Sequence, residues 1–393
     1  MKKSNLTIKT FGILFCLSLM INAQSNTGLS QDNSGAKTKT FNVNKGGKLD
    51  VQISTGDIKI AIWNKDEVNI KIASEDKEDI NSINATLENN TVKIRNDHSS
   101  WRGLSSDISL TINIPSDFNV DINTQSGDVI QTGSLKGTTN IFTSGGDIKT
   151  GDVSGRTNLK SNGGDIATGN IGDELTISTN GGDVRTGVVS GKLSINTMGG
   201  SINVSKADKD LNVSTMGGDI NVGNVGGTAD VKTMGGSIGI GTVSGNANIN
   251  TYGGDISLSG ATGNIESNTY GGNIDLKNIN GFVNAETKSG NIYVELNPSG
   301  GNSKIKSLNG NVVLYLPTNA KINVSATVIS RPYNRNDENK EMMKLIHSDF
   351  ETINLSNVDL RDNKIIAKYA INGGGKNYIE IYTINGSIQI KKK

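Results

Sequence analysis

The sequence predicts an all-β protein: a single-stranded parallel β-solenoid (β-helix) of about ten 18-residue coils with irregular β caps at both ends. Three observations predict this fold. A glycine-rich turn recurs every eighteen residues, apolar residues occupy every second position between turns, and glycine gathers where proline is missing. A repeat this short cannot bury an apolar face alone, so successive repeats must stack into one elongated body.

The recurring turn sets the extent of the array. An acidic or small polar residue closes each of nine successive turns: Asp147, Asp165, Asp183, Ser201, Asp219, Ser237, Asp255, Asn273 and Asn291. The interval is one residue longer back to Asp128 and two residues longer forward to Asn311, so the array covers residues 126–312. With about 4.8 Å between stacked strands, ten coils predict a rod on the order of 50 Å long.

Alternation with a period of two indicates strands within each coil. The apolar positions form three columns: Ile148, Ile166, Val184, Ile202, Ile220, Ile238, Ile256, Ile274 and Ile292; Leu193, Leu211, Ala229 and Ala247; and Ile177, Ile195, Val213, Val231 and Ile249. Thirty-eight of the 49 glycines lie between Gly127 and Gly310, where corners must bend sharply. No proline occurs between Pro115 and Pro298, as expected if interior strands donate every ladder hydrogen bond.

The flanking regions predict export and capping. Two lysines, an apolar run over residues 11–21 and Ala23 are typical of a secretory signal peptide, which we expect to span residues 1–23. A polar stretch, residues 24–39, is expected to be a disordered linker. Residues 40–125 and 313–393 alternate like strands without the strict period, so each is expected to form a β cap over a bare sheet edge. We expect a periplasmic, cell-surface or secreted protein.

Composition excludes several classes of function. The only cysteine, Cys16, lies in the predicted signal peptide, so the mature chain would have no disulfide, thiol catalyst or cysteine-ligated metal. Signal cleavage also removes three lysines and leaves 36 basic against 38 acidic residues, a net charge of −2. This balance argues against a nucleic-acid partner. No cofactor, no metal and no transmembrane segment after cleavage are expected.

Several motifs carry a resemblance to a known family. They are Thr55-Gly56-Asp57-Ile58, the repeated Gly-Gly-Asp-Ile turns, Leu316-Pro317 after the array, Ile371-Asn372-Gly373-Gly374-Gly375, and Ile384-Asn385-Gly386-Ser387-Ile388. In this order they resemble the bacterial "putative adhesin" β-strand-repeat family, a domain of unknown function, over nearly the whole mature chain. The resemblance implies an exported β-solenoid with a role in adhesion and no known active site.

The acidic turn column admits two interpretations. Asp147, Asp165, Asp183, Asp219 and Asp255 resemble calcium-binding nonapeptide repeats in their Gly-Gly turns and spacing. The turns lack the following Gly-x-Asp step, however, and serine or asparagine interrupts the acids. We therefore expect a turn-forming column in which Asp, Asn and Ser bond their own backbone. Melting that depends on Ca²⁺ would overturn this interpretation.

A second column precedes the glycine pairs. Met198, Met216, Met234, Tyr252 and Tyr270 occupy five successive coils, and strand parity places them on the outside. A stripe of this kind, on the order of 20 Å long, would suit a glycan, a peptide or a partner sheet. The alternative is that these side chains stack on one another or lie under a cap segment and only shield the corner.

Two further sets of residues have structural interpretations. Parity points the threonine column, Thr179 through Thr287, inward, where hydroxyls can bond one another or nearby carbonyls. An outward threonine array, as a flat binding surface, is the alternative. The only histidines, His98 and His347, fall in different caps, which gives little support to a metal cluster or a Ser-His-Asp site.

The sequence therefore predicts an exported, non-enzymatic adhesin-like protein that makes repeated weak contacts along a stiff rod. A glycan or a cell-surface protein is the candidate partner. Two alternatives stay open. One is a carbohydrate-active β-helix enzyme, which would need convergent acids on a broad face. The other is a purely structural envelope spacer that binds no ligand.

Overall fold

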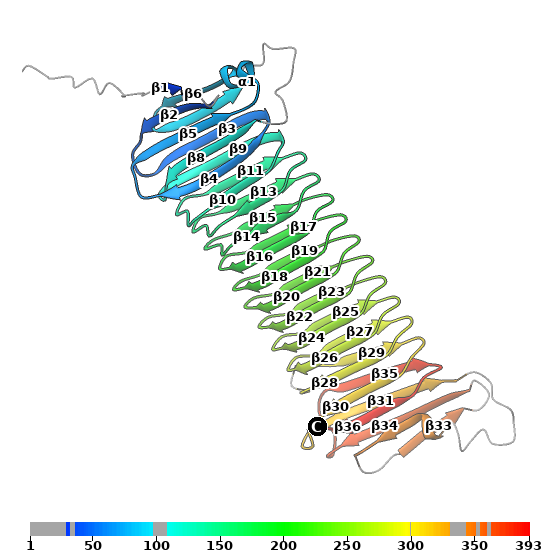
Figure 1. Ribbon diagram of the computed structural model, residues 1–393. Coiled ribbons are helices and arrows are strands. Elements are labelled where there is room, and N and C mark those ends of the chain that lie inside the picture. The colour runs from blue at the N-terminus through cyan, green and yellow to red at the C-terminus, as the bar shows by residue number, and fades with distance from the viewer. Residues whose placement is uncertain are drawn as a thin grey trace, which may run out of the picture.

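The computed structural model describes residues 29–31, 36–96, 108–298, 300–330, 343–350, 354–359 and 363–393. The predicted signal peptide, most of the predicted linker and His98 lie outside these ranges. In the described chain, strands form one elongated stack that runs from the N-terminal to the C-terminal end (Figure 1). Among the described residues, no helix has the length and apolar character needed to cross a membrane.

Each coil of the array contributes one strand to each of two long parallel sheets. The first sheet contains β10 (Val129–Thr132), β12 (Ile148–Thr150), β14 (Ile166–Thr168), β16 (Val184–Val189), β18 (Ile202–Ala207), β20 (Ile220–Val225), β22 (Ile238–Val243), β24 (Ile256–Ala261), β26 (Ile274–Ile279), β28 (Ile292–Leu296) and β30 (Val312–Leu316). The second contains β9 (Phe118–Ser126), β11 (Thr139–Thr143), β13 (Thr157–Ser161), β15 (Leu175–Ser178), β17 (Leu193–Asn196), β19 (Leu211–Ser214), β21 (Ala229–Lys232), β23 (Ala247–Asn250), β25 (Ile265–Thr269), β27 (Val283–Thr287) and β29 (Ser303–Ser307).

The predicted β-solenoid is confirmed, with like residues paired rung over rung. In the first sheet Ile220 pairs with Ile202 on one side and Ile238 on the other, and in the second sheet Leu193 pairs with Leu211. The residues of all three predicted columns are buried. A further inward column, missed in the sequence, begins with Leu135, Val153, Ile171 and Val189, which are joined by parallel bridges. The core between the sheets is therefore a set of stacked aliphatic ladders.

The N-terminal end continues the stack beyond the strict period. Here β3 (Gly47–Thr55) pairs in parallel with β9, and β4 (Asp57–Trp63) pairs in parallel with β10. On their far edges lie β7 (Thr91–Asn96) and β8 (Ser109–Pro115), again in parallel. The region predicted to be an irregular cap thus holds two more rungs, and the outermost rung comes from residues later in the sequence than the rung inside it.

Antiparallel strands cover the N-terminal rung. In the second sheet β6 (Ile83–Glu88) pairs with β7, after the short helix α1 (Lys77–Ser82). In the first sheet β5 (Glu67–Ala73) pairs with β8, followed by β2 (Ala36–Asn42) and β1 (Leu29–Gln31). An edge strand of reversed direction cannot be extended by another parallel coil, so the sheets end here as a solenoid cap requires.

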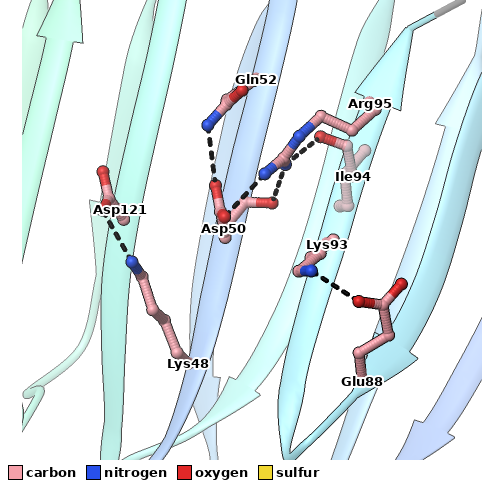
Figure 2. A network of polar contacts seen from close by, with 8 residues as sticks. All are labelled: Lys48, Asp50, Gln52, Glu88, Lys93, Ile94, Arg95 and Asp121. Atoms are coloured by element: carbon pink, nitrogen blue, oxygen red, sulfur yellow. Dashed lines mark hydrogen bonds and ion pairs between the residues drawn. The ribbon is translucent and has the colours of Figure 1, made fainter.

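Charged side chains cross-link the outer face of the second sheet at this end. Asp50 on β3 accepts from Arg95 on β7 at 2.6 Å, and Lys48 on β3 donates to Asp121 on β9 at 2.8 Å (Figure 2). The two pairs tie the outermost rungs to the array on both sides of β3. Because these groups are partly exposed, each pair stabilises the fold by only about 1 kcal/mol or less.

The C-terminal end repeats the same inverted order. The last two strands, β35 (Tyr378–Ile384) and β36 (Ile388–Lys392), pair in parallel with β29 and β30. Their other edges pair with β31 (Ile322–Ile329) and β32 (Ile346–Ser348), which follows the 3₁₀ turn η1 (Met343–Leu345). The antiparallel strands β34 (Lys364–Ile371) and β33 (Asn354–Asp359) then end the second sheet. The last strand, β36, therefore lies between the earlier strands β30 and β32, and the C-terminus lies near β30 (Figure 1).

One buried tyrosine in this end gives a prediction about alkaline stability. The Tyr369 hydroxyl is buried with no hydrogen-bond partner among the described residues, and burial raises its pKa to about 12. The unfolded chain loses this proton near pH 10 and the folded chain keeps it, so stability is lost as pH rises from about 10 to about 12. Burial, together with Tyr315, also raises the pKa of Tyr293 to about 12, so the two residues act in the same direction.

We expect Tyr369→Phe to keep or raise the free energy of unfolding at neutral pH, by up to about 1 kcal/mol, because no hydrogen bond is lost. The variant should also lose less stability in alkali than the parent protein. Urea denaturation near neutral pH and near pH 11 measures both effects. A large destabilisation at neutral pH would show that the hydroxyl has a partner.

Candidate binding surface

The corner after each strand of the second sheet is held by a buried threonine. The Thr215 hydroxyl donates to the carbonyl oxygen of Gly200 in the preceding coil at 2.9 Å and accepts from the amide of Gly218 at 3.4 Å. The same donation to the preceding coil recurs along the column at Thr179, Thr197, Thr233, Thr251, Thr269 and Thr287. The structure thus places the threonine column inward, as expected, and the hydroxyls bond carbonyls of the neighbouring coil.

The acidic turn column forms a second ladder between coils. The amide of Asp165 donates to Oδ1 of Asp147 at 2.7 Å, and the amide of Asp183 donates to Oδ1 of Asp165 at 2.8 Å. The carboxylates of Asp183, Asp219 and Asp255 accept in the same way from the next coil. Asn273 and Ser237 do so as well. The expectation that these side chains bond their own backbone is corrected: the partner lies one coil further on.

This ladder accounts for the mixture of Asp, Asn and Ser in one column, because each offers a side-chain oxygen at the same height. At Asp183 the second carboxylate oxygen also pairs with Arg185 at 3.1 Å. Among the residues that the structure describes, no three His, Cys, Asp or Glu side chains are grouped so that they could hold a metal ion. The turn column therefore has a structural role, because its side-chain oxygens join consecutive corners by hydrogen bonds.

The five apolar residues before the glycine pairs lie on the outside of these corners. Their exposed fractions are 51% for Met198, 46% for Met216, 59% for Met234, 60% for Tyr252 and 43% for Tyr270. We call this row the ridge. Among the described residues, only Tyr378 is a comparably exposed large hydrophobic outside it. No cap segment within the described ranges covers the ridge, because these side chains are about half open to solvent.

A groove of about 480 Å³ runs beside the ridge. Its opposite wall is a row of outward side chains at the ends of the strands of the second sheet, which we call the bank: Asn196, Ser214, Lys232, Asn250, Asn268 and Glu286. The inward threonines form the floor. The groove therefore has one apolar wall and one polar wall over several successive coils.

The aromatic part of the ridge is ordered by stacking. The rings of Tyr252 and Tyr270 lie 4.5 Å apart between centroids and within 6° of parallel. Lys288, in the same position of the next coil, places its ammonium 3.5 Å from the centroid of Tyr270. Both faces of the Tyr270 ring are thus occupied by neighbours, and ring edges and hydroxyls are left for a ligand.

The ridge extends further than the apolar pattern indicated. Lys288 lies eighteen residues after Tyr270, so its spacing alone could have added it to the column. Leu308 and Ile384 follow Ser307 and Thr383, whose hydroxyls donate to corner glycines as in the array. These two positions were not predictable from a fixed period, because the intervals before them are 20 and 76 residues.

The contact between Lys288 and Tyr270 gives a second prediction. Hydrogen bonding to the Lys288 ammonium, and then its charge, lower the pKa of the Tyr270 hydroxyl. We therefore expect Lys288→Ala to raise this pKa towards the ordinary value of about 10. Ultraviolet titration of tyrosinate measures the shift, and a Tyr270→Phe variant identifies which part of the curve belongs to Tyr270. An unchanged curve in Lys288→Ala would contradict the contact.

The histidine and the charged side chains that were considered for a metal or catalytic site lie, with one exception, away from the groove. His347 on β32 is exposed and lies 3.3 Å from Asp349, at the C-terminal end. Charged pairs on the outer faces, such as Lys277 with Asp275 at 3.1 Å, join positions two residues apart on one strand. Among the described residues that line the groove, Glu286 is the one carboxylate, and Lys306 donates to it at 2.8 Å.

The chain has weak similarity to solved structures and matches one family model. One similar solved structure is a putative adhesin from Bacteroides fragilis NCTC 9343, with 17% identity over 66% of this chain and 96% of that chain and a TM-score of 0.28. Another is a putative cell adhesion protein from Clostridium sporogenes ATCC 15579, with 13% identity, 91% and 100% coverage and a TM-score of 0.16. No curated protein matches the sequence. Residues 173–359 match the family model Toastrack DUF4097. The predicted resemblance to a repeat family of unknown function is thereby confirmed over residues 173–359, where the chain is similar to the Toastrack DUF4097 model.

Proposed function

We propose that the protein is an exported, non-enzymatic adhesin-like rod that holds a protein partner through the ridge and the groove. The observation that carries the proposal is the row of half-exposed Met and Tyr side chains on five successive coils. Soluble proteins rarely expose a contiguous apolar row unless it contacts another molecule. Contacts that repeat on a stiff rod add avidity without a deep pocket.

The chemistry of the groove favours a polypeptide over a glycan. Sugar rings bind aromatic side chains through ring faces, and both faces of Tyr270 are occupied by Tyr252 and Lys288. Methionine side chains are flexible and polarizable, so they adapt to apolar side chains of a protein partner. The polar bank offers amides for hydrogen bonds on the opposite wall.

The groove supports binding more readily than hydrolysis. Glycoside hydrolysis uses a pair of carboxylates on either side of the scissile bond. The groove wall offers Glu286, which is already paired with Lys306. A depolymerase assay on bacterial and plant glycans tests this point: turnover would favour the enzyme alternative, and saturable binding without turnover favours the adhesin.

The proposal is tested by removing the apolar ridge. We expect Met216→Ser combined with Met234→Ser and Tyr252→Ser to abolish attachment of the purified protein to protein-coated surfaces, with an unchanged circular dichroism spectrum. The matched control is Asn162→Ser with Asn180→Ser, because both residues occupy the same corner position in earlier coils. Attachment that survives the triple substitution would overturn the proposal. A parent protein that attaches to nothing would favour the spacer alternative.

A further inference from the structure

The spacing of the ridge restricts what can contact all of it at once. Ridge side chains recur at the rung spacing of stacked strands, about 4.8 Å. A helix repeats every 5.4 Å along its axis, and a single strand presents same-face side chains roughly 6.6 Å apart, so both fall out of step within a few rungs. A partner that stays in step is itself a stack of parallel strands. A second copy of this chain supplies such a stack.

The order of residues along the ridge suits a two-fold axis. Across eight rungs the ridge and its extension read Met198, Met216, Met234, Tyr252, Tyr270, Lys288, Leu308 and Ile384. An axis that crosses the rod between Tyr252 and Tyr270, at right angles to it, makes two copies antiparallel and sets ridge against ridge. Tyr252 then faces Tyr270 of the second copy, Met216 faces Leu308, and Met198 faces Ile384. The apolar stem of Lys288 lies against Met234.

The bank shows charge complementarity about the same axis. Lys232 lies in the coil of Met234, and Glu286 lies in the coil of Lys288, so the axis places Lys232 opposite Glu286 of the second copy. Asn250 faces Asn268 in the same way. A slip of one rung in one direction sets Lys232 against Asn268, and a slip in the other sets it against Lys306. Of these three registers, only the centred one pairs opposite charges, and one of the other two is disfavoured by repulsion.

We propose that the ridge and bank bind a second copy of this chain, antiparallel and centred between Tyr252 and Tyr270. The inference rests on the proposed function and names the partner of that surface. Eight rungs give a strip about 34 Å long. A narrow strip of this length falls near the lower limit of specific interfaces, about 1,200 Å² in total, so the pair is weak and gains strength when many copies are displayed together. Antiparallel pairing is the geometry of rods that meet from two facing surfaces.

Sedimentation equilibrium of the purified protein over a wide concentration range tests the pairing. We expect a reversible monomer–dimer equilibrium. Lys232→Glu alone and Glu286→Lys alone should each weaken it at least tenfold, and the two substitutions combined in one chain should restore it. The matched control is Lys277→Glu, since Lys277 pairs with Asp275 on the first sheet as Lys232 pairs with Asp230 on the second. The control should leave the dimer unchanged.

Disulfide formation tests the register. The only cysteine of the chain, Cys16, lies far outside the groove sequence, so new cysteines report alone once it is replaced by serine. A mixture of Asn250→Cys and Asn268→Cys variants should cross-link in high yield, and each variant alone should cross-link poorly. Equal yields in all three samples would overturn the antiparallel register.

The two proposals fail in different ways. A protein that stays monomeric at all concentrations but attaches to protein-coated surfaces through the ridge would overturn the second-copy inference and leave the proposed function intact. A dimer that the charge substitutions do not weaken would also overturn the inference, because the pairing would use another surface. A dimer through the ridge without any attachment of displayed protein would overturn the adhesive role alone.

Discussion

Alanine at Gly164 should lower the free energy of unfolding by about 3 kcal/mol, whereas alanine at the adjacent Gly163 should change it by less than about 1 kcal/mol. A Cβ atom at Gly164 would lie well inside 3.0 Å of the backbone of Gly146 in the preceding coil. A Cβ atom at Gly163 would meet its nearest neighbour, the carbonyl oxygen of Gly145, at 3.8 Å. Neither glycine has a left-handed φ, so the two positions differ only in how closely the preceding coil approaches.

Urea denaturation of the two variants measures the difference, with circular dichroism as the signal. The same close approach recurs at the second glycine of the other corners, including Gly146, Gly182, Gly200, Gly236, Gly254 and Gly272. Substituting two such glycines in distant coils should therefore cost about the sum of the single effects. Equal stability of Gly163→Ala and Gly164→Ala would mean that adjacent corners do not stack this closely.

Deleting residues 378–393 should unfold the C-terminal end of the rod. The deletion removes β35 and β36, which pair on both edges and bury Ile379, Ile381, Ile388 and Ile390. At roughly 1.5–3 kcal/mol for each buried side chain, the loss is on the order of 10 kcal/mol. That exceeds what a few remaining strands can offset, so β31 and β34 should lose their place in the stack.

Hydrogen exchange followed by mass spectrometry measures this loss. We expect fast exchange over residues 303–330 in the truncated protein and unchanged protection over the middle of the array, because each coil contacts only its neighbours. The control is deletion of Lys393 alone, which leaves both strands whole and removes only the hydrogen bonds of this residue to Leu316, Asn278 and Glu295. Protection that persists at residues 303–330 after the longer deletion would contradict the inserted position of β35 and β36.

The array was predictable from the sequence because one physical constraint repeats in it. Parallel stacking puts Ile202, Ile220 and Ile238 in one ladder, and eighteen residues separate each from the next. The ends were not predictable in this way. The rung β3–β4 lies 71 residues before its partner rung, as Leu49 with Val120 shows, and no fixed period can reveal such a pairing. The inverted order of the rungs depends on the path that the chain takes at each end. Local sequence patterns carry no information about that path.

The candidate surface was predictable in part for a similar reason. Strand parity placed Met216 and Tyr252 outside, and their exposure confirms it. Lys288 was left out because the column was defined by apolar character, although its stem and charge complete the aromatic stack. The partner of the Asp turn residues was misassigned because rules for isolated turns consider only the local backbone. In a solenoid the nearest amide belongs to the next coil.

The corner ladders have a consequence for how such a protein changes in size. Every internal unit offers a neighbour the same contacts through its threonine, its glycine pair and its turn oxygen. Loss or duplication of one eighteen-residue unit in frame would therefore leave both termini of the stack intact and alter only its reach, by about 4.8 Å each time. The number of eighteen-residue units that the gene encodes therefore sets the length of the rod in steps of one coil.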